Sequence, residues 1–221
     1  LLIGSGPRIG LQPAAEYTFL CLVIPVGDYY KGGLAAPVNA LLIEDFDRAA
    51  PAGVGAVKVA GNYAADLLPN MLSKQQGFPI GLYLDANTHT TIEEFSTSNF
   101  VGIDNDTNTY ITPKSPSVLP SITNKSLMQL ATDEFEMKVE ARDVPVEELE
   151  RLDEVLAVGT AVVVTPVGSV TRLPKSDDKE MQRYEFGGGE IGPTTRRLYD
   201  RVRAIQNGEV EDPYGWNVLV D

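Results

Sequence analysis

The stretch that decides how this chain is interpreted places one lysine among small and apolar residues: Ala56-Val57-Lys58-Val59-Ala60-Gly61-Asn62-Tyr63-Ala64-Ala65. An ammonium group held among apolar side chains loses hydration and releases its proton more readily. An uncharged lysine amine is a nucleophile. The flanking residues therefore allow a strand lysine with a reactive amine. Taken alone they favour the ordinary alternative, a strand lysine whose amine reaches past its neighbours to water, and the case for a reactive amine comes from segments further along the chain.

Nucleophilic lysines form Schiff bases with carbonyl compounds and with pyridoxal phosphate, PLP, and three later segments carry groups that a PLP site needs. PLP is an electron sink when a carboxylate keeps its ring nitrogen protonated, and Glu94 in residues 91–100 could do so. Residues 119–131 predict a helix after a Pro-Ser start, whose free N–H groups suit a phosphate. Residues 157–164 contain a Gly-Thr turn that could hold another oxyanion. Each signal is weak alone, because a solvated glutamate and a helix N-terminus are both common.

Taken in order, these segments resemble the branched-chain amino acid aminotransferases, which are PLP enzymes of fold type IV. The resemblance rests on four motifs: Lys58-x-x-x-Asn62-Tyr63-Ala64, Glu94-x-x-Thr97-x-Asn99, Leu119-Pro120-x-Ile122-Thr123-x-Lys125-Ser126 and Gly159-Thr160-Ala161-x-Val163-Val164-x-Pro166-Val167-Gly168. It extends through nearly the whole chain, from residues 3–7 to residues 205–216. It implies an α/β fold (an α+β pseudo-barrel), the PLP-binding large domain of the D-amino acid aminotransferase-like enzymes.

The resemblance also implies roles for individual residues. Lys58 would be the Schiff-base lysine and the proton shuttle, and Glu94 would pair with the pyridinium nitrogen. Tyr63 would hydrogen-bond the 3′-oxygen of PLP. The phosphate would be bound by Ile122, Thr123 and Thr160. The substrate side would include Thr97 and Ala161, which match positions near the substrate carboxylate, and Tyr29, which matches a tyrosine near the side-chain pocket.

The domain organisation implied by the resemblance is incomplete. Residues 1–15 would be the end of an interdomain linker and residues 16–221 the large domain, while the small N-terminal domain of the family has no counterpart here. That domain normally supplies an arginine for the PLP phosphate and covers the substrate. We therefore expect a folded chain with little or no activity of its own.

The implied reaction is reversible amino transfer between leucine, isoleucine or valine and 2-oxoglutarate, and the implied assembly of the full-length enzyme is a homodimer. Two alternatives stay open. The chain could be another fold type IV PLP enzyme, a D-amino acid aminotransferase or an aminodeoxychorismate lyase. It could also be a non-catalytic domain that keeps the fold.

Composition restricts the other functional classes. The formal charge of −13 argues against nucleic acid, whose phosphates would be repelled. His89 is the single histidine, in a polar turn-like stretch, so a multi-histidine zinc site is excluded and no metal is expected. The apolar runs are too short for a membrane span. We expect a soluble intracellular protein, with cytoplasm, mitochondrion and plastid not distinguishable.

The hydrophobic pattern predicts alternating strands and helices. Strands are expected at residues 17–26, where the single cysteine, Cys21, would be buried, at 39–44, around Lys58, at 80–84 and at 155–164, with one wet-faced strand near 135–141. A hairpin is expected from 95 to 112. Helices are expected at residues 63–76, 122–132 and 146–152, with a terminal helix from about 192 to 207.

Overall fold

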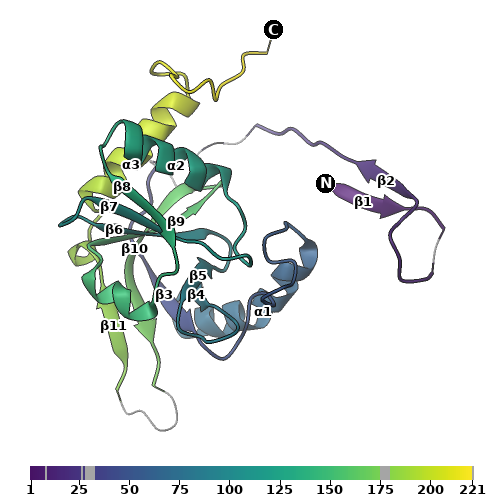
Figure 1. Cartoon of the computed structure of the whole chain (residues 1–221), viewed down its shortest axis with the longest axis horizontal. Coiled ribbons are helices and arrows are strands. Elements are labelled where there is room, and N and C mark those ends of the chain that lie inside the picture. Colours follow the sequence, from purple (N-terminus) through teal and green to yellow (C-terminus); the bar gives the residue numbers. More distant parts are fainter. Residues whose placement is uncertain (8, 26, 28–32, 175–179, 221) are drawn as a thin grey trace.

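The computed structural model describes residues 1–7, 9–25, 27, 33–174 and 180–220. Within this part of the chain, nine strands form one mixed sheet flanked by helices, and a separate two-stranded hairpin extends away from it (Figure 1). The hairpin consists of β1 (Leu2–Ser5) and β2 (Glu16–Phe19), paired antiparallel. It crosses the expected domain boundary at residues 15 and 16, and that division stays a prediction.

The large sheet closes on itself. Its main path runs β11 (Gln182–Glu185), β10 (Val163–Arg172), β3 (Val38–Ile43), β4 (Ile80–Leu84), β5 (Ile92–Phe95), β6 (Asn99–Asp104), β7 (Thr109–Pro113) and β8 (Lys138–Arg142). The remaining strand, β9 (Glu154–Gly159), pairs with both β10 and β6. The path β10–β3–β4–β5–β6–β9 therefore returns to β10, which confirms the predicted pseudo-barrel of an α/β protein.

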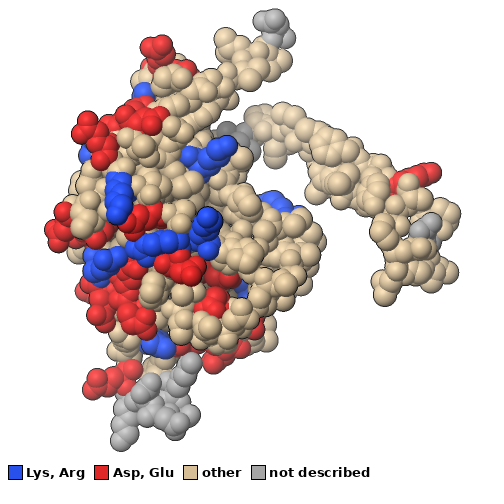
Figure 2. Space-filling model, in the orientation of Figure 1, with Lys and Arg blue, Asp and Glu red and all other residues tan. Residues whose placement is uncertain are grey.

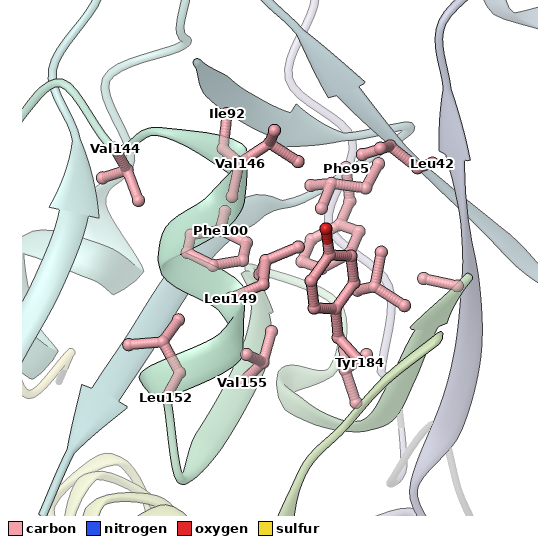
Figure 3. Close-up of a cluster of buried hydrophobic side chains, with 14 of the residues drawn as sticks. Leu42, Ile92, Phe95, Phe100, Val144, Val146, Leu149, Leu152, Val155 and Tyr184 are labelled. Atoms are coloured by element: carbon pink, nitrogen blue, oxygen red, sulfur yellow. The ribbon is translucent and has the colours of Figure 1, made fainter. Parts of the chain in front are cut away.

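Alternation along the barrel strands divides the core between two sides, because successive strand side chains point to opposite faces. On β3, Ala40 and Leu42 join a cluster to which every barrel strand contributes, whereas Leu41 and Ile43 join another with Tyr83. The shared cluster fills the barrel, and the 3-10 helix η1 (Val146–Arg151) adds Val146 and Leu149 to it (Figure 3).

Three helices cover the outside of the barrel. A second cluster packs β6, β7 and β9 against α2 (Ile122–Asp133) and α3 (Pro193–Gln206). The first helix, α1 (Ala60–Gln75), contacts β4, ends where Gly77 adopts a positive φ, and buries Asp66, Pro69 and Ser73. The helices expected at residues 63–76, 122–132 and 192–207 are thus confirmed, and the one at 146–152 is a 3-10 helix.

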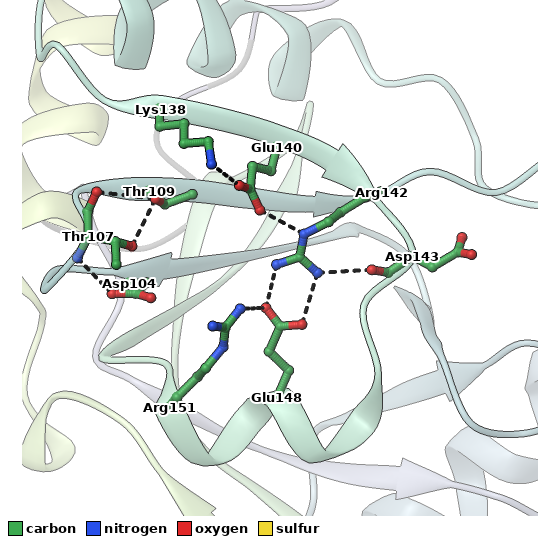
Figure 4. A network of polar contacts seen from close by, with 9 residues as sticks. All are labelled: Asp104, Thr107, Thr109, Lys138, Glu140, Arg142, Asp143, Glu148 and Arg151. Atoms are coloured by element: carbon green, nitrogen blue, oxygen red, sulfur yellow. Dashed lines mark hydrogen bonds and ion pairs between the residues drawn. The ribbon is translucent and has the colours of Figure 1, made fainter.

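Charged side chains gather on the surface of the barrel, whereas the hairpin arm carries few (Figure 2). One network joins β8 to η1 (Figure 4): Arg142 contacts Glu140 at 2.7 Å and Glu148 at 2.5 Å, and Arg151 also pairs with Glu148. These pairs are partly exposed, so they contribute little stability individually. The wet face predicted for this strand is confirmed.

Three expected strands differ from the structure, and one of them, the strand around Lys58, is a loop. The buried strand expected at residues 17–26 is wrong over residues 17–25, the part that the structure describes: β2 ends at Phe19, its residues are exposed and Cys21 is exposed. The apolar pattern there belongs to a hairpin that extends away from the large sheet and whose described large apolar residues are exposed. The strand expected at 155–164 is two strands, β9 and β10, because the chain reverses at residues 160–162.

Candidate active site

Lys58 lies in an exposed loop rather than in a strand, two residues before α1 begins. The prediction of a lysine buried among apolar neighbours is therefore wrong, because Val54 and Val57 are themselves exposed. The loop is nevertheless fixed. Asn62 of α1 donates hydrogen bonds through Nδ2 to the carbonyls of Val54 and Val57, at 2.9 and 2.8 Å.

The same loop is pressed against the segment that precedes α2. A Cβ added at Gly55 would lie 2.3 Å from the carbonyl oxygen of Ser117, so no larger residue fits there without displacing backbone. The loop that carries Lys58 and the approach to α2 are thus held together by close packing.

Glu94 lies on β5, nine-tenths or more buried. Its Oε1 lies 2.8 Å from Nη2 of Arg48, and its Oε2 accepts a hydrogen bond from Nδ2 of Asn99 at 3.0 Å. Burial raises the pKa of Glu94 to about 7, although Arg48 and a backbone hydrogen bond from Leu119 act in the opposite direction. Near neutral pH this carboxyl can be ionised, and then pair with a positive charge, or carry a proton itself.

Arg48 is the residue that sequence reasoning missed. It follows β3 in the loop before Lys58 and is only 7% exposed, although arginine is rarely buried without a partner. In the sequence it stands beside Asp47 and gives no sign of burial. Its partner is close only in the fold, so spacing alone could not reveal it.

The N-terminus of α2 opens into the same region. Ser121 caps the helix by accepting a hydrogen bond from the N–H of Asn124 at 3.1 Å. Asn124 is fixed in turn by Tyr110 and Thr112 of β7, at 2.7 and 2.9 Å. The N–H groups of Ile122 and Thr123 have no acceptor within the helix, as at any helix start, and they can hold an anion.

A cavity of about 390 Å³ brings most of the predicted residues together. Its lining includes Lys58, Tyr63, Glu94, Thr97, Ile122 and Thr160, together with Arg48 and Asn99. Thr123 and Ala161 do not line it, although each adjoins a residue that does. Tyr29 lies outside the described residues, so its predicted place near the substrate side chain stays a prediction.

The turn that presents Thr160 has an unusual backbone. Val163 has a φ of 62°, rare for a β-branched residue, and the N–H of Val164 bonds the carbonyl of Val162 at 2.7 Å. Burial of the Val163 side chain in the cluster beneath α3 offsets this strain. Strained turns of this kind occur at sites that hold a ligand.

Outside the cavity, the alternative kinds of site are one built on the single histidine and one built on metal ligands. His89 is exposed, and its Nε2 lies 2.8 Å from Oδ1 of Asp47. In the described part of the chain, no group of three or more His, Cys, Asp or Glu side chains is arranged to hold a metal. Over the same residues, no helix is both long and apolar enough to cross a bilayer.

Comparison with known proteins places the fold in a transferase family. The model of the class IV amino-transferases matches residues 3–170, and the chain belongs to that family. The branched-chain-amino-acid aminotransferase of Haemophilus influenzae is 47% identical over 100% of this chain and 63% of its own length. The chain thus spans less than two thirds of the length of this curated relative.

Two solved structures of branched-chain amino acid aminotransferases also resemble this chain. A branched-chain amino acid aminotransferase of Escherichia coli has a TM-score of 0.74 at 30% identity, over 94% of this chain and 64% of that one. The Thermobaculum terrenum branched-chain enzyme, solved in its PLP form, has a TM-score of 0.67 at 25% identity, over 79% of this chain and 52% of that one. The family and this neighbour imply a PLP-dependent class of enzyme.

Proposed function

We propose that this chain is the PLP-binding part of a branched-chain amino acid aminotransferase, which transfers an amino group reversibly between leucine, isoleucine or valine and 2-oxoglutarate. The observation that carries the proposal is one cavity that joins an exposed lysine, Lys58, to a buried carboxylate, Glu94. The positive charge of Lys58 is close enough to oppose the rise in the pKa of Glu94.

The donor set fits PLP from end to end. Glu94 would hold the proton on the ring nitrogen, and the hydroxyl of Tyr63 would donate a hydrogen bond to the 3′-oxygen of PLP. The N–H groups of Ile122 and Thr123, with the hydroxyl of Thr160, would hold the phosphate at the opposite end. When bound there, PLP supplies an electron sink for charge that develops at the substrate Cα.

The remaining steps belong to the protein. Lys58 would attach the cofactor through Nζ, and the same amine, once released, would move the proton between the substrate Cα and the C4′ atom of the cofactor. Thr97 and the N–H of Ala161 would orient the substrate carboxylate, and Tyr29 would contact its side chain. The assembly would be a homodimer, as the resemblance implies.

A transamination assay tests the proposal. With PLP and 2-oxoglutarate present, we expect amino transfer from leucine, with weak turnover in the 221-residue chain and higher turnover in a chain extended at its N-terminus to the length of the relatives. Lys58→Ala should abolish it, whereas Lys74→Ala, at the far end of α1, should not. Transfer from D-alanine but not from leucine would instead support a D-amino acid aminotransferase. No transfer from either donor by the extended chain would refute the proposal.

A further inference from the structure

Arg48 is a buried cation in the wall of the cavity to which the proposed function gives no role. Its Nη2 makes two contacts, one to Oε1 of Glu94 at 2.8 Å and one to the carbonyl oxygen of Ser117. Nη2 of a guanidinium carries two hydrogens, so these contacts use both. A buried charge is tolerated only when it is paired and hydrogen-bonded in this way.

Asn99 makes a parallel connection from the other side of the carboxylate. Its Nδ2 donates both to Oε2 of Glu94 and to the carbonyl of Leu119, each at 3.0 Å. Arg48 and Asn99 thus hold one oxygen each of Glu94 and one carbonyl each of the segment 117–119. That segment leads directly to Ser121, the cap of α2.

We propose that Arg48 is a positioning residue that favours the ionised form of Glu94 and joins it to the segment leading into α2. The carboxylate for the ring nitrogen and the N–H groups for the phosphate would then form one rigid unit, so that both ends of a flat ligand are fixed at once. The role of this unit in holding a cofactor rests on the proposed function, whereas the effect of Arg48 on the ionisation of Glu94 does not.

The charges around Glu94 determine the direction of the expected effect. Arg48, from the loop after β3, and Lys58, from the loop before α1, favour the carboxylate, whereas burial and Glu93 of β5 favour the protonated acid. Arg48 also acts on Tyr83 of β4, which is hydrogen-bonded to Asp66 of α1. Removing the charge of Arg48 leaves burial less opposed, so the pKa of Glu94 rises.

The test is a carbon-13 NMR titration of the Glu94 carboxyl in the chain free of cofactor, assigned with Glu94→Gln. We expect Arg48→Gln to raise the midpoint by at least about one pH unit, Arg48→Lys to raise it less, and Arg201→Gln, which removes a surface ion pair with Glu134, to leave it unchanged. An unchanged or lowered midpoint in Arg48→Gln would overturn the inference.

Hydrogen exchange of the Arg48 guanidinium in the unaltered chain gives a second measurement, which decides the matter if Arg48→Gln does not fold. Exchange should be slow at pH values above the titration midpoint of Glu94 and faster below it. An exchange rate that does not change across this midpoint would contradict the ion pair between Arg48 and Glu94. With PLP added at pH 7, Arg48→Gln should bind about fivefold more weakly, because fewer molecules carry an ionised Glu94. A shifted midpoint without any PLP binding would sink the proposed function and leave the role of Arg48 standing.

Discussion

Glu94 is the residue on which the proposed chemistry depends most, because its carboxyl is buried, paired and adjacent to the lysine loop. Replacing it by Gln keeps the shape and removes the charge. In a chain extended to the length of the relatives, we expect Glu94→Gln to lower turnover by about a hundredfold or more. The turnover rate with leucine as the amino donor measures this loss.

Glu93→Gln is the matched control for this prediction. Glu93 precedes Glu94 on the same strand, and its Oε1 accepts a hydrogen bond from Ser115 at 2.7 Å, outside the cavity of Lys58. Its variant should turn over leucine nearly normally. The reverse pattern, with Glu94→Gln active and Glu93→Gln inactive, would transfer the role to Glu93.

At the same scale, the sequence predicted which candidate residues lie together better than it predicted their surroundings. Lys58 and Glu94 were predicted from neighbours along the chain and do meet in one cavity. The exposure of Lys58 was missed, because Val54 and Val57 face solvent. Arg48 was missed because its partner is 46 residues away in sequence and adjacent only through the pairing of β3, β4 and β5.

Among the elements, α2 carries the proposed phosphate site at its start. Ser121→Ala removes the acceptor for the Asn124 N–H and should lower the free energy of unfolding by about 1 kcal/mol. PLP affinity should fall as well, because the first turn frays. Denaturant unfolding measures the stability, with Ser126→Ala inside the helix as control. Equal losses from both variants would contradict a capping role.

The turn between β4 and β5, which leads into the strand that carries Glu94, is held together by Asp85. Asp85 accepts hydrogen bonds from the N–H groups of Thr88, Thr90 and Thr91, at 2.8 to 3.0 Å. Burial alone would raise the pKa of Asp85, but these bonds hold it well below its usual range. A carboxyl with a lowered folded-state pKa stabilises the fold above its unfolded pKa of about 4, and this stabilisation is lost as the pH falls further.

Asp85→Asn should therefore lower the melting temperature at pH 7, and the difference from the unaltered chain should shrink as the pH drops below about 4. Thermal melts across this pH range check it. Asp106→Asn, the same change in the exposed turn between β6 and β7, should have little effect at any pH. A deficit for Asp85→Asn that is constant with pH would show that the carboxylate charge is not what stabilises the turn.

Elements with a packed partner were predictable from the pattern, and elements without one were not. The strand Ile80–Leu84 and the helices α2 and α3 bury apolar faces, and their periodicity revealed them. The β1–β2 hairpin has the apolar residues of a buried strand yet is exposed. Its pattern alone gave no sign of that.

Over the whole molecule, closure of the barrel brings the site together from distant segments. Residues of the cavity come from the loop after β3, the start of α1, β5, the approach to α2 and the β9–β10 turn. A ligand that touches all of them should stabilise the entire fold by mass action, by about 2.7 kcal/mol at a hundred times its Kd. PLP should raise the melting temperature of the chain, and pyridoxal, which lacks the phosphate, should raise it less. Equal shifts would argue against the anion site at α2.

The central claim, that Lys58 carries the cofactor, is tested most directly by reducing the chain with borohydride in the presence of PLP and mapping the modified peptide. We predict one pyridoxyl group on Lys58, a visible absorbance band that disappears on reduction, and no stoichiometric label in Lys58→Ala. A pyridoxyl group on Lys74, Lys114 or Lys125 instead of Lys58 would contradict the account.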